Sequence, residues 1–288
     1  MRVVGRSKRE VTDIKFQEGH TKETHVKTKR FKVGNLKLEV HENGRAAGEA
    51  AAQAAAEKLN ELRRLEATIG VIFATGASQL DTLHALTMAD VPWSQIKGFH
   101  LDEYVGMSSD HPASFRRYLR ENLTSKVQMK EFLEIDGTAP DIQDVCREYI
   151  GNIQSTNPSL CLMGVGENGH LAFNDPAEAR FDDPVDMKVV HLDELCREQQ
   201  FAEGWFRSLD EVPTVAMTLT IPALFRVPTL IGSVPGSRKA KIMRLALEGP
   251  ISTDCPASIL RTHPDATVYL DKESAAELNG LLEFEEAE

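Results

Sequence analysis

The sequence predicts a three-layer α/β fold, in which helices cover both faces of a doubly wound, mostly parallel sheet of the Rossmann-like kind. Three near-continuous apolar runs are typical of parallel strands that are buried on both faces: residues 68–74, 160–163 and 229–234. Segments with helical spacing lie between these runs, and such alternation of strands and helices favours a doubly wound sheet.

Length and charge limit the domain organisation and the possible partners. The chain has 288 residues, of which 41% are hydrophobic, and it can bury a full core. Residues 1–35 carry a net charge of +6 and the remainder −17. We therefore expect a basic N-terminal extension, partly disordered or packed on a neighbour, and a single α/β domain over residues 36–288. The overall net charge of −11 argues against a nucleic-acid-binding protein, and the basic extension lacks the interleaved aromatic residues of a nucleic-acid arm.

The cysteines and the hydrophobic pattern indicate a reduced, cytoplasmic protein. The four cysteines form no Cys-x-x-Cys pair and have no zinc spacing, so we expect free thiols and no metal site. The first residues lack the apolar core of a signal peptide, and no run of 18 apolar residues occurs. We therefore predict a cytoplasmic protein that does not bind a membrane.

The N-terminal half begins with a strand and a long helix. Residues 36–40 alternate between apolar and polar side chains, as in a strand. Residues 42–65 are rich in alanine and strongly helix-forming, with Gly48 as the only weak point. After the apolar run over 68–74, the expected elements are a helix over 79–89, a strand over 98–101 and helices over 113–124 and 141–154.

The C-terminal half contains a polar and aromatic stretch over 192–206 and then residues 212–220, which alternate like a strand that projects threonines to one side. An apolar-periodic helix follows the run over 229–234. The last expected elements are a helix over 257–263, a strand over 267–270 and, from Asp271, an acidic tail that forms a frayed or solvated helix.

The turn after the first buried strand consists of Thr75, Gly76, Ala77 and Ser78. A strand, a turn of small and hydroxyl residues and a helix N-terminus bring free backbone amides, a favourable dipole and two hydroxyl groups together. This arrangement predicts an anion site. The alternative is an ordinary helix capped by Ser78.

Lys239 occupies a similar place, in the turn Gly-Ser-Arg-Lys-Ala that follows the third apolar run. A lysine at a helix N-terminus is unfavourable for the helix dipole unless an anion lies there. We interpret the neighbouring Arg238 as a solvated surface residue.

The most informative stretch is Gly-Val-Gly-Glu-Asn-Gly-His-Leu-Ala-Phe-Asn-Asp-Pro at residues 164–176. Its glycines allow close approach of a ligand, and Asn168, His170 and Asp175 can form one hydrogen-bonded group if the loop curls back. A histidine flanked by an amide and a carboxylate suits proton transfer near neutral pH. The alternative is a structural turn, and the glycine spacing alone is a weak signal for a dinucleotide fold.

Asp102 and Glu103 stand in a second polar stretch, Gly-Phe-His-Leu-Asp-Glu-Tyr-Val-Gly at residues 98–106. In a strand the two carboxylates point to opposite sides, so at most one of them faces a common pocket with His170. The alternative is a solvated acidic turn.

Together, the motifs Leu-Asp-Glu-Tyr-Val-Gly, His-Pro-x-Ser-Phe and Gly-Val-Gly-x-x-Gly-His-x-Ala-Phe-Asn resemble those of the glucosamine-6-phosphate deaminase (isomerase) family. That family is related in fold to 6-phosphogluconolactonase, and the resemblance covers about residues 70–270. It implies a sugar-phosphate isomerase type of fold and a small-molecule sugar phosphate as the partner. It also implies that no cofactor or metal is needed, and it favours a homo-oligomer.

The resemblance further implies roles for individual residues. Asp102 would transfer a proton between C2 and C1 of the sugar, and His170 would open the pyranose ring. Asp175 would orient His170 and favour its charged form, and Asn168 would hold the imidazole in place. An arginine near residues 192–206 would help to bind phosphate, with Arg197 as the candidate and Arg207 as the fallback. The other expected substrate-binding residues are Thr75, Gly76, Ala77, Ser78, Gly166 and Lys239.

Three of these positions depart from the family pattern. Ala77 replaces a frequent second glycine. Asn168 stands where an aspartate is often found, so the charged form of His170 loses one stabilising charge. Asp175 stands where a glutamate is usual and is one methylene shorter, so we expect its reach to His170 to need a water molecule or a shifted loop.

We therefore predict an enzyme, a deaminase or isomerase that converts glucosamine 6-phosphate to fructose 6-phosphate and ammonia. The alternatives are a galactosamine-6-phosphate deaminase, a 6-phosphogluconolactonase and a non-catalytic sugar-phosphate sensor. The lactonase family follows its aspartate and glutamate with an arginine, where this chain has Tyr104. A sensor would keep the phosphate-binding residues but lose the acid and base, whereas Asp102 and His170 are both present.

Overall fold

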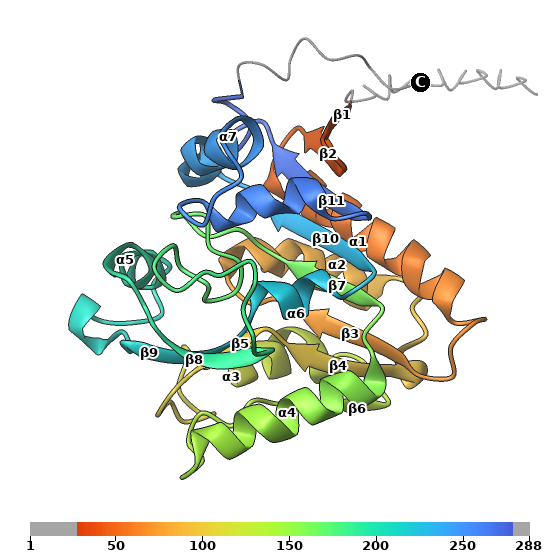
Figure 1. Cartoon of the computed structure of the whole chain (residues 1–288). Coiled ribbons are helices and arrows are strands. Elements are labelled where there is room, and N and C mark those ends of the chain that lie inside the picture. The colour runs from red at the N-terminus through yellow and green to blue at the C-terminus, as the bar shows by residue number, and fades with distance from the viewer. Residues whose placement is uncertain (1–27, 279–288) are drawn as a thin grey trace, which may run out of the picture.

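The computed structural model describes residues 28–278 (Figure 1). The first 27 residues of the expected basic extension lie outside this range, and so does the acidic tail beyond residue 278. Within the described range, every helix is too short or too polar to span a bilayer.

The main sheet confirms the predicted α/β class. All its neighbouring strands pair in parallel except the first two along the chain, which pair antiparallel. In spatial order its eight strands are β1 (Lys29–Val33), β2 (Leu36–His41), β11 (Ala266–Asp271), β10 (Thr229–Val234), β7 (Leu160–Met163), β3 (Ile69–Phe73), β4 (Ile96–His100) and β6 (Glu131–Phe132).

Strand β1 extends this sheet beyond the boundary that the sequence suggested. It pairs along its whole length with β2, from Lys29 opposite Val40 to Val33 opposite Leu36. The sheet therefore begins before Leu36, in residues assigned above to the extension.

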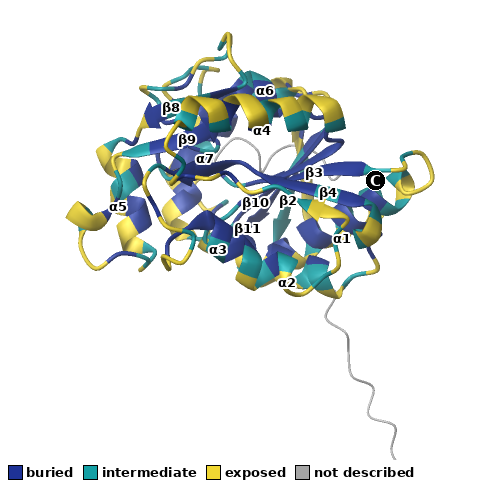
Figure 2. Ribbon diagram, turned by 90° about the horizontal axis from the view of Figure 1, so that it is seen from below, coloured by how far each residue is buried: buried dark blue, intermediate teal, exposed yellow. Residues whose placement is uncertain are grey.

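Helices cover both faces of the sheet, which makes the three layers (Figure 2). Helices α1 (Gly44–Leu62) and α2 (Leu80–Met88) lie on one side of the sheet, and α4 (Ile142–Thr156) and α6 (Ile221–Phe225) lie on the other. Successive strand residues point to opposite faces. Val71 and Phe73 of β3 accordingly pack in the core with α1 and α2, whereas Ile72 packs in the core with Tyr149 of α4.

The alanine-rich composition of α1 follows from its contact with α2. Asn43 caps the helix by accepting a hydrogen bond from the backbone N–H of Ala46. A Cβ at Gly48 would lie 2.7 Å from the Cβ of Asp81, so glycine is needed where the two helices cross. The weak point noted in the sequence is thus a position where α1 packs too closely on α2 for any side chain.

A second, three-stranded antiparallel sheet was not expected as such. It consists of β5 (Asp102–Tyr104), β9 (Val215–Leu219) and β8 (Met187–His191), and only β9 lies within a predicted strand. Asp102 pairs with Thr218 of β9. Only Leu101 separates β4 of the main sheet from β5 of the small one.

The remaining helices are mostly short. They are α3 (Phe115–Leu119), which continues into a π-helical turn, α5 (Glu194–Ala202), and α7 (Ala240–Glu248). The helix expected over 257–263 is instead a 3₁₀ helix, η6 (Pro256–Thr262).

Candidate active site

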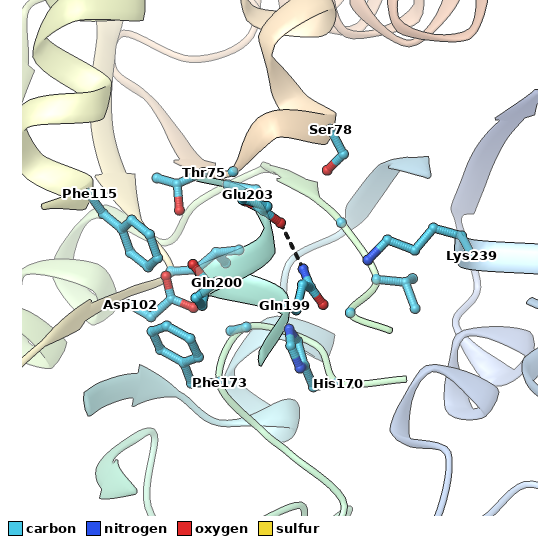
Figure 3. A pocket seen from close by; sticks show the side chains of 17 residues that line it. Thr75, Ser78, Asp102, Phe115, His170, Phe173, Gln199, Gln200, Glu203 and Lys239 are labelled. Atoms are coloured by element: carbon cyan, nitrogen blue, oxygen red, sulfur yellow. Dashed lines mark hydrogen bonds between the residues drawn. The ribbon is translucent and has the colours of Figure 1, made fainter. Parts of the chain in front are cut away.

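A pocket lies where the carboxyl ends of β3, β4, β7 and β10 meet (Figure 3). Such a strand edge is the usual place for a site in an open α/β sheet. The structure brings seven of the expected site residues to this pocket: Thr75, Gly76, Ser78, Asp102, Gly166, His170 and Lys239.

The two strands that flank β7, which are β3 and β10, end in turns of the same shape. Gly76 after β3 has φ +100°, and Gly236 after β10 has φ +98°, a backbone conformation that favours glycine. Each glycine precedes a one-turn 3₁₀ helix and then an α-helix, α2 or α7. Both turns therefore direct the start of a helix towards the pocket.

The turn after β3 is held by Gln79, whose buried amide donates hydrogen bonds to Ser78 Oγ and to the carbonyl of Ser233, both at 3.0 Å. The second bond joins the turn to β10, which lies on the other side of β7 in the sheet. Ala77 does not line the pocket with its side chain, but its backbone N–H donates to the carboxylate of Glu203, which does.

The turn after β10 places Lys239 in the pocket, where only 8% of the residue is exposed. Burial lowers the pKa of Lys239 to about 8, although the nearby charges of Glu167 and Glu203 partly oppose this shift. Arg238 remains half exposed and pairs with Glu167 at 3.1 Å, as its surface interpretation predicts.

His170 faces the pocket, and its Nδ1 atom lies 2.9 Å from Oδ1 of Asp175, which is fully buried. This direct contact shows that no bridging water is needed, contrary to our expectation for the shorter side chain. Burial raises the pKa of Asp175, but the contacts with His170 and Asn168 and the backbone N–H of Asp193 outweigh it, and the pKa is lowered overall. Asp175 is therefore a carboxylate that can hold a protonated imidazole.

Asn168 lies behind His170 and does not line the pocket. Its side-chain oxygen accepts from the backbone N–H of His170, and its amide donates to Oδ1 of Asp175 and to Oδ2 of Asp193. It thus fixes the loop and the carboxylate instead of contacting the imidazole.

Gly166 lies directly beside the imidazole of His170. A Cβ at this position would lie 2.3 Å from both Cε1 and Nε2 of the ring. Glycine is required here because any larger residue would displace the histidine.

Asp102 enters the pocket where the chain passes from β4 to β5 and is 5% exposed. Burial raises its pKa well above the usual value, and the charge of Glu103 raises it further. His100 holds the backbone here, because its Nδ1–H donates to the carbonyl of Asp102 while its Nε2 accepts from the N–H of Ile135. Burial lowers the pKa of His100 to about 3, so this histidine is neutral.

Glu103 points to the opposite side, as strand alternation predicts. Its carboxylate accepts hydrogen bonds from Ser114 Oγ and from the backbone N–H groups of Tyr104, Phe115 and Arg116. It therefore anchors the start of α3, which places Phe115 in the pocket wall.

Helix α5 and its C-cap residue supply pocket residues that the sequence analysis missed: Gln199 and Gln200 from the helix and Glu203 from the cap. Gln199 and Gln200 precede Glu203 by four and three residues, a spacing that marks one face of a helix and was a usable signal. Phe173 and Phe115, which were noted only as parts of motifs, form apolar walls.

Arg197, the candidate for phosphate binding, does not line the pocket. Its guanidinium donates to the backbone carbonyls of Leu209 at 2.8 Å and Val212 at 3.3 Å, on the far side of α5. The fallback, Arg207, is exposed and also lies outside the pocket lining. The ionisable group that enters the pocket from the end of α5 is instead the carboxylate of its C-cap residue, Glu203.

His170, Asp175 and Cys196 place donor atoms within 4.8 Å of one another, as a metal site would require. Burial raises the pKa of Cys196 well above its usual value, so the thiol stays protonated, and a protonated thiol is a poor metal ligand. Asp175 also already accepts bonds from Asn168 and Asp193. These three residues are better suited to holding a proton than to holding a metal.

Comparison with known proteins identifies relatives that span most of the chain. The sequence model of a family described as glucosamine-6-phosphate isomerases/6-phosphogluconolactonase matches residues 42–269. A glucosamine-6-phosphate deaminase of Exiguobacterium sibiricum is 36% identical over 74% of this chain and 81% of its own length. One from Lactobacillus delbrueckii subsp. bulgaricus is 33% identical over 84% of this chain and 99% of its own length.

Solved structures share the fold. A monomeric glucosamine-6-phosphate deaminase superimposes with a TM-score of 0.77 at 29% identity and covers 83% of this chain and 99% of its own. A 6-phosphogluconolactonase from Thermotoga maritima gives a TM-score of 0.67 at 21% identity, with 82% and 99% of the two chains covered.

Proposed function

The chain belongs to the family of glucosamine-6-phosphate isomerases and 6-phosphogluconolactonases, and from this premise we propose that it is an aminosugar-phosphate deaminase. It converts glucosamine 6-phosphate and water to fructose 6-phosphate and ammonia. The curated relatives at 33% and 36% identity carry the name of this deaminase, whereas the lactonase at 21% identity bears on the fold alone.

The observation that carries the proposal is that Asp102 and His170 line one pocket, Asp102 from the junction of β4 and β5 and His170 from the loop after β7. The reaction needs a group that opens the sugar ring and a base that moves a proton from C2 to C1. Burial raises the pKa of Asp102, which makes its carboxylate a stronger base. His170 opens the ring, and Asp175 holds the imidazolium that forms when it takes up a proton.

The phosphate binds at the other side of the pocket, at the turn of Thr75, Gly76, Ala77 and Ser78 and at Lys239. Backbone N–H groups at a helix start and a lysine ammonium are complementary to a phosphate dianion. Proton transfer from C2 to C1 leaves an imine at C2, and addition of water there releases ammonia. This last step is a hydrolysis of the carbon–nitrogen bond.

The same proposal includes the setting of the enzyme. We place it in the cytoplasm, acting on a small-molecule sugar phosphate without a cofactor and not on a nucleic acid, in line with its net charge of −11. The single catalytic domain begins with β1 at Lys29, so the basic extension that precedes it is shorter than residues 1–35. Assembly into a homo-oligomer stays a prediction, since the solved deaminase cited above is described as monomeric.

The test is release of ammonia together with formation of fructose 6-phosphate from glucosamine 6-phosphate, with galactosamine 6-phosphate assayed in parallel. Asp102→Asn and His170→Ala should each abolish release, because they remove the base and the ring-opening group. Glu198→Gln, an exposed position on α5, is the matched control and should keep full activity.

Failure of both amino sugars to release ammonia would contradict the proposal. Hydrolysis of 6-phosphogluconolactone in the same preparation would then identify a lactonase. Binding of sugar phosphate without turnover of any of the three compounds would identify a sensor.

A further inference from the structure

We propose that the carboxylate of Glu203 occupies the phosphate position of the pocket in the resting protein, so that a sugar phosphate binds only by displacing it. This inference deepens the proposed function and rests on it in one respect: it takes the turn of residues 75–78 as the phosphate site. Glu203 is then a specificity-determining residue that every ligand must compete with.

The first support is the position of the carboxylate over the turn. Oε2 of Glu203 accepts a hydrogen bond of 3.5 Å from the backbone N–H of Ala77, the first residue of the 3₁₀ helix after Gly76. A Cβ built on Gly76 would lie 3.8 Å from the same oxygen. N–H groups at a helix start bind anions, and here the anion is a side chain of the protein itself.

The second support is the set of other donors around this carboxylate. Trp205 Nε1 donates to Oε2 at 3.3 Å, and Gln199 Nε2 donates to Oε1 at 3.0 Å. The charge of Glu203 also raises the pKa of Lys239 against the effect of burial, so the ammonium and the carboxylate interact across the pocket. Figure 3 shows Glu203 and Lys239 in the same pocket as Thr75 and Ser78.

A phosphate dianion cannot share this position with a carboxylate. Both groups are attracted by the same N–H donor and by the nearby ammonium, and like charges at close range repel each other. Binding is therefore an exchange of one anion for another. A phosphate ester can win this exchange because it carries up to two charges and three acceptor oxygens, whereas a sugar without phosphate offers nothing to replace the carboxylate.

Trp205 lies where it can report the exchange. Its ring packs edge-on against Tyr118, with the centroids 6.3 Å apart, and the hydroxyl of Tyr118 donates to the carbonyl of Gly76 at 2.8 Å. Displacement of Glu203 removes a carboxylate from the indole N–H beside the phosphate turn. The chain has only one other tryptophan, Trp93, so the signal can be isolated.

The experiment compares Glu203→Gln with Glu198→Gln and the unchanged full-length protein, using calorimetric titration with inorganic phosphate and with fructose 6-phosphate. Glu198 is an exposed residue of α5, the helix that Glu203 caps, and its variant has the same change in net charge. The titrations are run at pH 6.5, below the pKa of about 8 of Lys239, so that its ammonium stays charged even when the support of Glu203 is lost.

Removal of an internal competitor raises the fraction of protein that is ready to bind. We expect Glu203→Gln to bind both ligands about tenfold more tightly or better, with Glu198→Gln unchanged. Glu203→Ala should also bind both ligands more tightly, and it has no side chain that could occupy the turn again. In a Trp93→Phe background, phosphate should change the emission of Trp205 when Glu203 is present, and the change should be smaller in Glu203→Ala.

Equal or weaker phosphate binding by both Glu203 variants would overturn the inference, and so would absence of phosphate binding in all the proteins. The readout is binding of phosphate and does not depend on turnover. An active deaminase with unchanged affinities would contradict this inference alone, whereas tighter binding without release of ammonia would contradict the proposed function alone.

Discussion

Nδ1 of His170 lies 2.9 Å from Oδ1 of Asp175, and Asp175 has no exposed surface. The pKa of this carboxyl is lowered overall despite its burial, because the imidazole, Asn168 and a backbone N–H all favour its charged form. An ionised carboxylate at Nδ1 fixes the donor role of that nitrogen and leaves Nε2 for proton exchange with a substrate.

Asp175→Asn should lower kcat by about 10²-fold, because the protonated imidazole loses its charged partner and general acid–base catalysis is worth at least that much. KM for the sugar phosphate should change little, since Asp175 does not line the pocket. Steady-state kinetics with glucosamine 6-phosphate checks both values. A variant that keeps the original kcat would show that the pair is not used in turnover.

The activity should depend on ionisation of Asp102 at an unusually high pH for an aspartate. Burial, and then the charge of Glu103, raise its pKa well above the usual value of 3.8, and the base is active only when it is deprotonated. A profile of kcat/KM against pH should therefore fall, as the pH is lowered, well before pH 4 is reached. A flat profile down to that pH in the unchanged enzyme would exclude Asp102 as the base.

The lowered pKa of Lys239 predicts that KM also changes with pH on the alkaline side. Burial lowers its pKa to about 8, and only the charged ammonium attracts a phosphate dianion. KM should therefore rise as the pH increases through about 8. Lys239→Arg should remove this rise, because an arginine stays charged, although the different shape will weaken binding at all pH values.

The control for this measurement is Lys241→Gln, which changes an exposed lysine in the first turn of α7, the helix that follows Lys239. It should keep both the affinity and the alkaline rise in KM. If KM of Lys239→Arg depends on pH in the same way as KM of the unchanged enzyme, the alkaline rise belongs to another group.

Gly166→Ala should lower kcat by about 10²-fold without unfolding the protein, because a shift of a catalytic group by about an ångström has that effect. The added Cβ would lie 2.3 Å from two atoms of the His170 ring, so the ring must move. Gly151→Ala in α4 is the matched control, since a Cβ there has no atom within 4 Å. This control should retain kcat and gain about 0.5–1 kcal/mol of stability from better helix propensity. Kinetics and thermal unfolding of both variants test the pair, and equal kcat values would contradict the argument.

Arg197→Ala should lower stability and leave phosphate binding intact. Its guanidinium holds the carbonyls of Leu209 and Val212, and loss of such charged hydrogen bonds costs about 1.5 kcal/mol. Chemical denaturation and KM for the sugar phosphate should be measured together. A large increase in KM with unchanged stability would instead indicate that Arg197 binds the phosphate.

The sequence predicts the elements whose pattern is strong and local. The continuous apolar runs that became β3, β7 and β10 are buried on both faces, so their composition alone identifies them. Strand β5 was missed because three residues, all buried, are too few to show a period, and β8 was missed because its five residues have mixed exposure and little periodicity. The 3₁₀ geometry of η6 was missed because apolar spacing does not distinguish it from an α-helix over two turns.

The site divides in the same way. Lys239 could be placed from the sequence, since a lysine at a helix start implies an anion nearby. Arg197 and Glu203 could not be told apart, because which of them points to the pocket depends on how α5 is rotated against the loop of His170. That rotation is fixed by contacts between distant segments, such as the bond from the backbone N–H of Glu167 to the side-chain oxygen of Gln199.

Asp102 stands at the border between the two sheets, with β4 ending at His100 and β5 starting at Asp102 itself. The two glycine turns of the proposed anion site follow strands of the main sheet. Substitutions in β8 or β9 can therefore re-aim the base while the anion site stays intact, and substitutions in the turns can alter anion preference while the base stays in place. The position of Asp102 and the shape of the anion site can therefore change independently, which is a physical route by which one fold can serve the two activities that name this family.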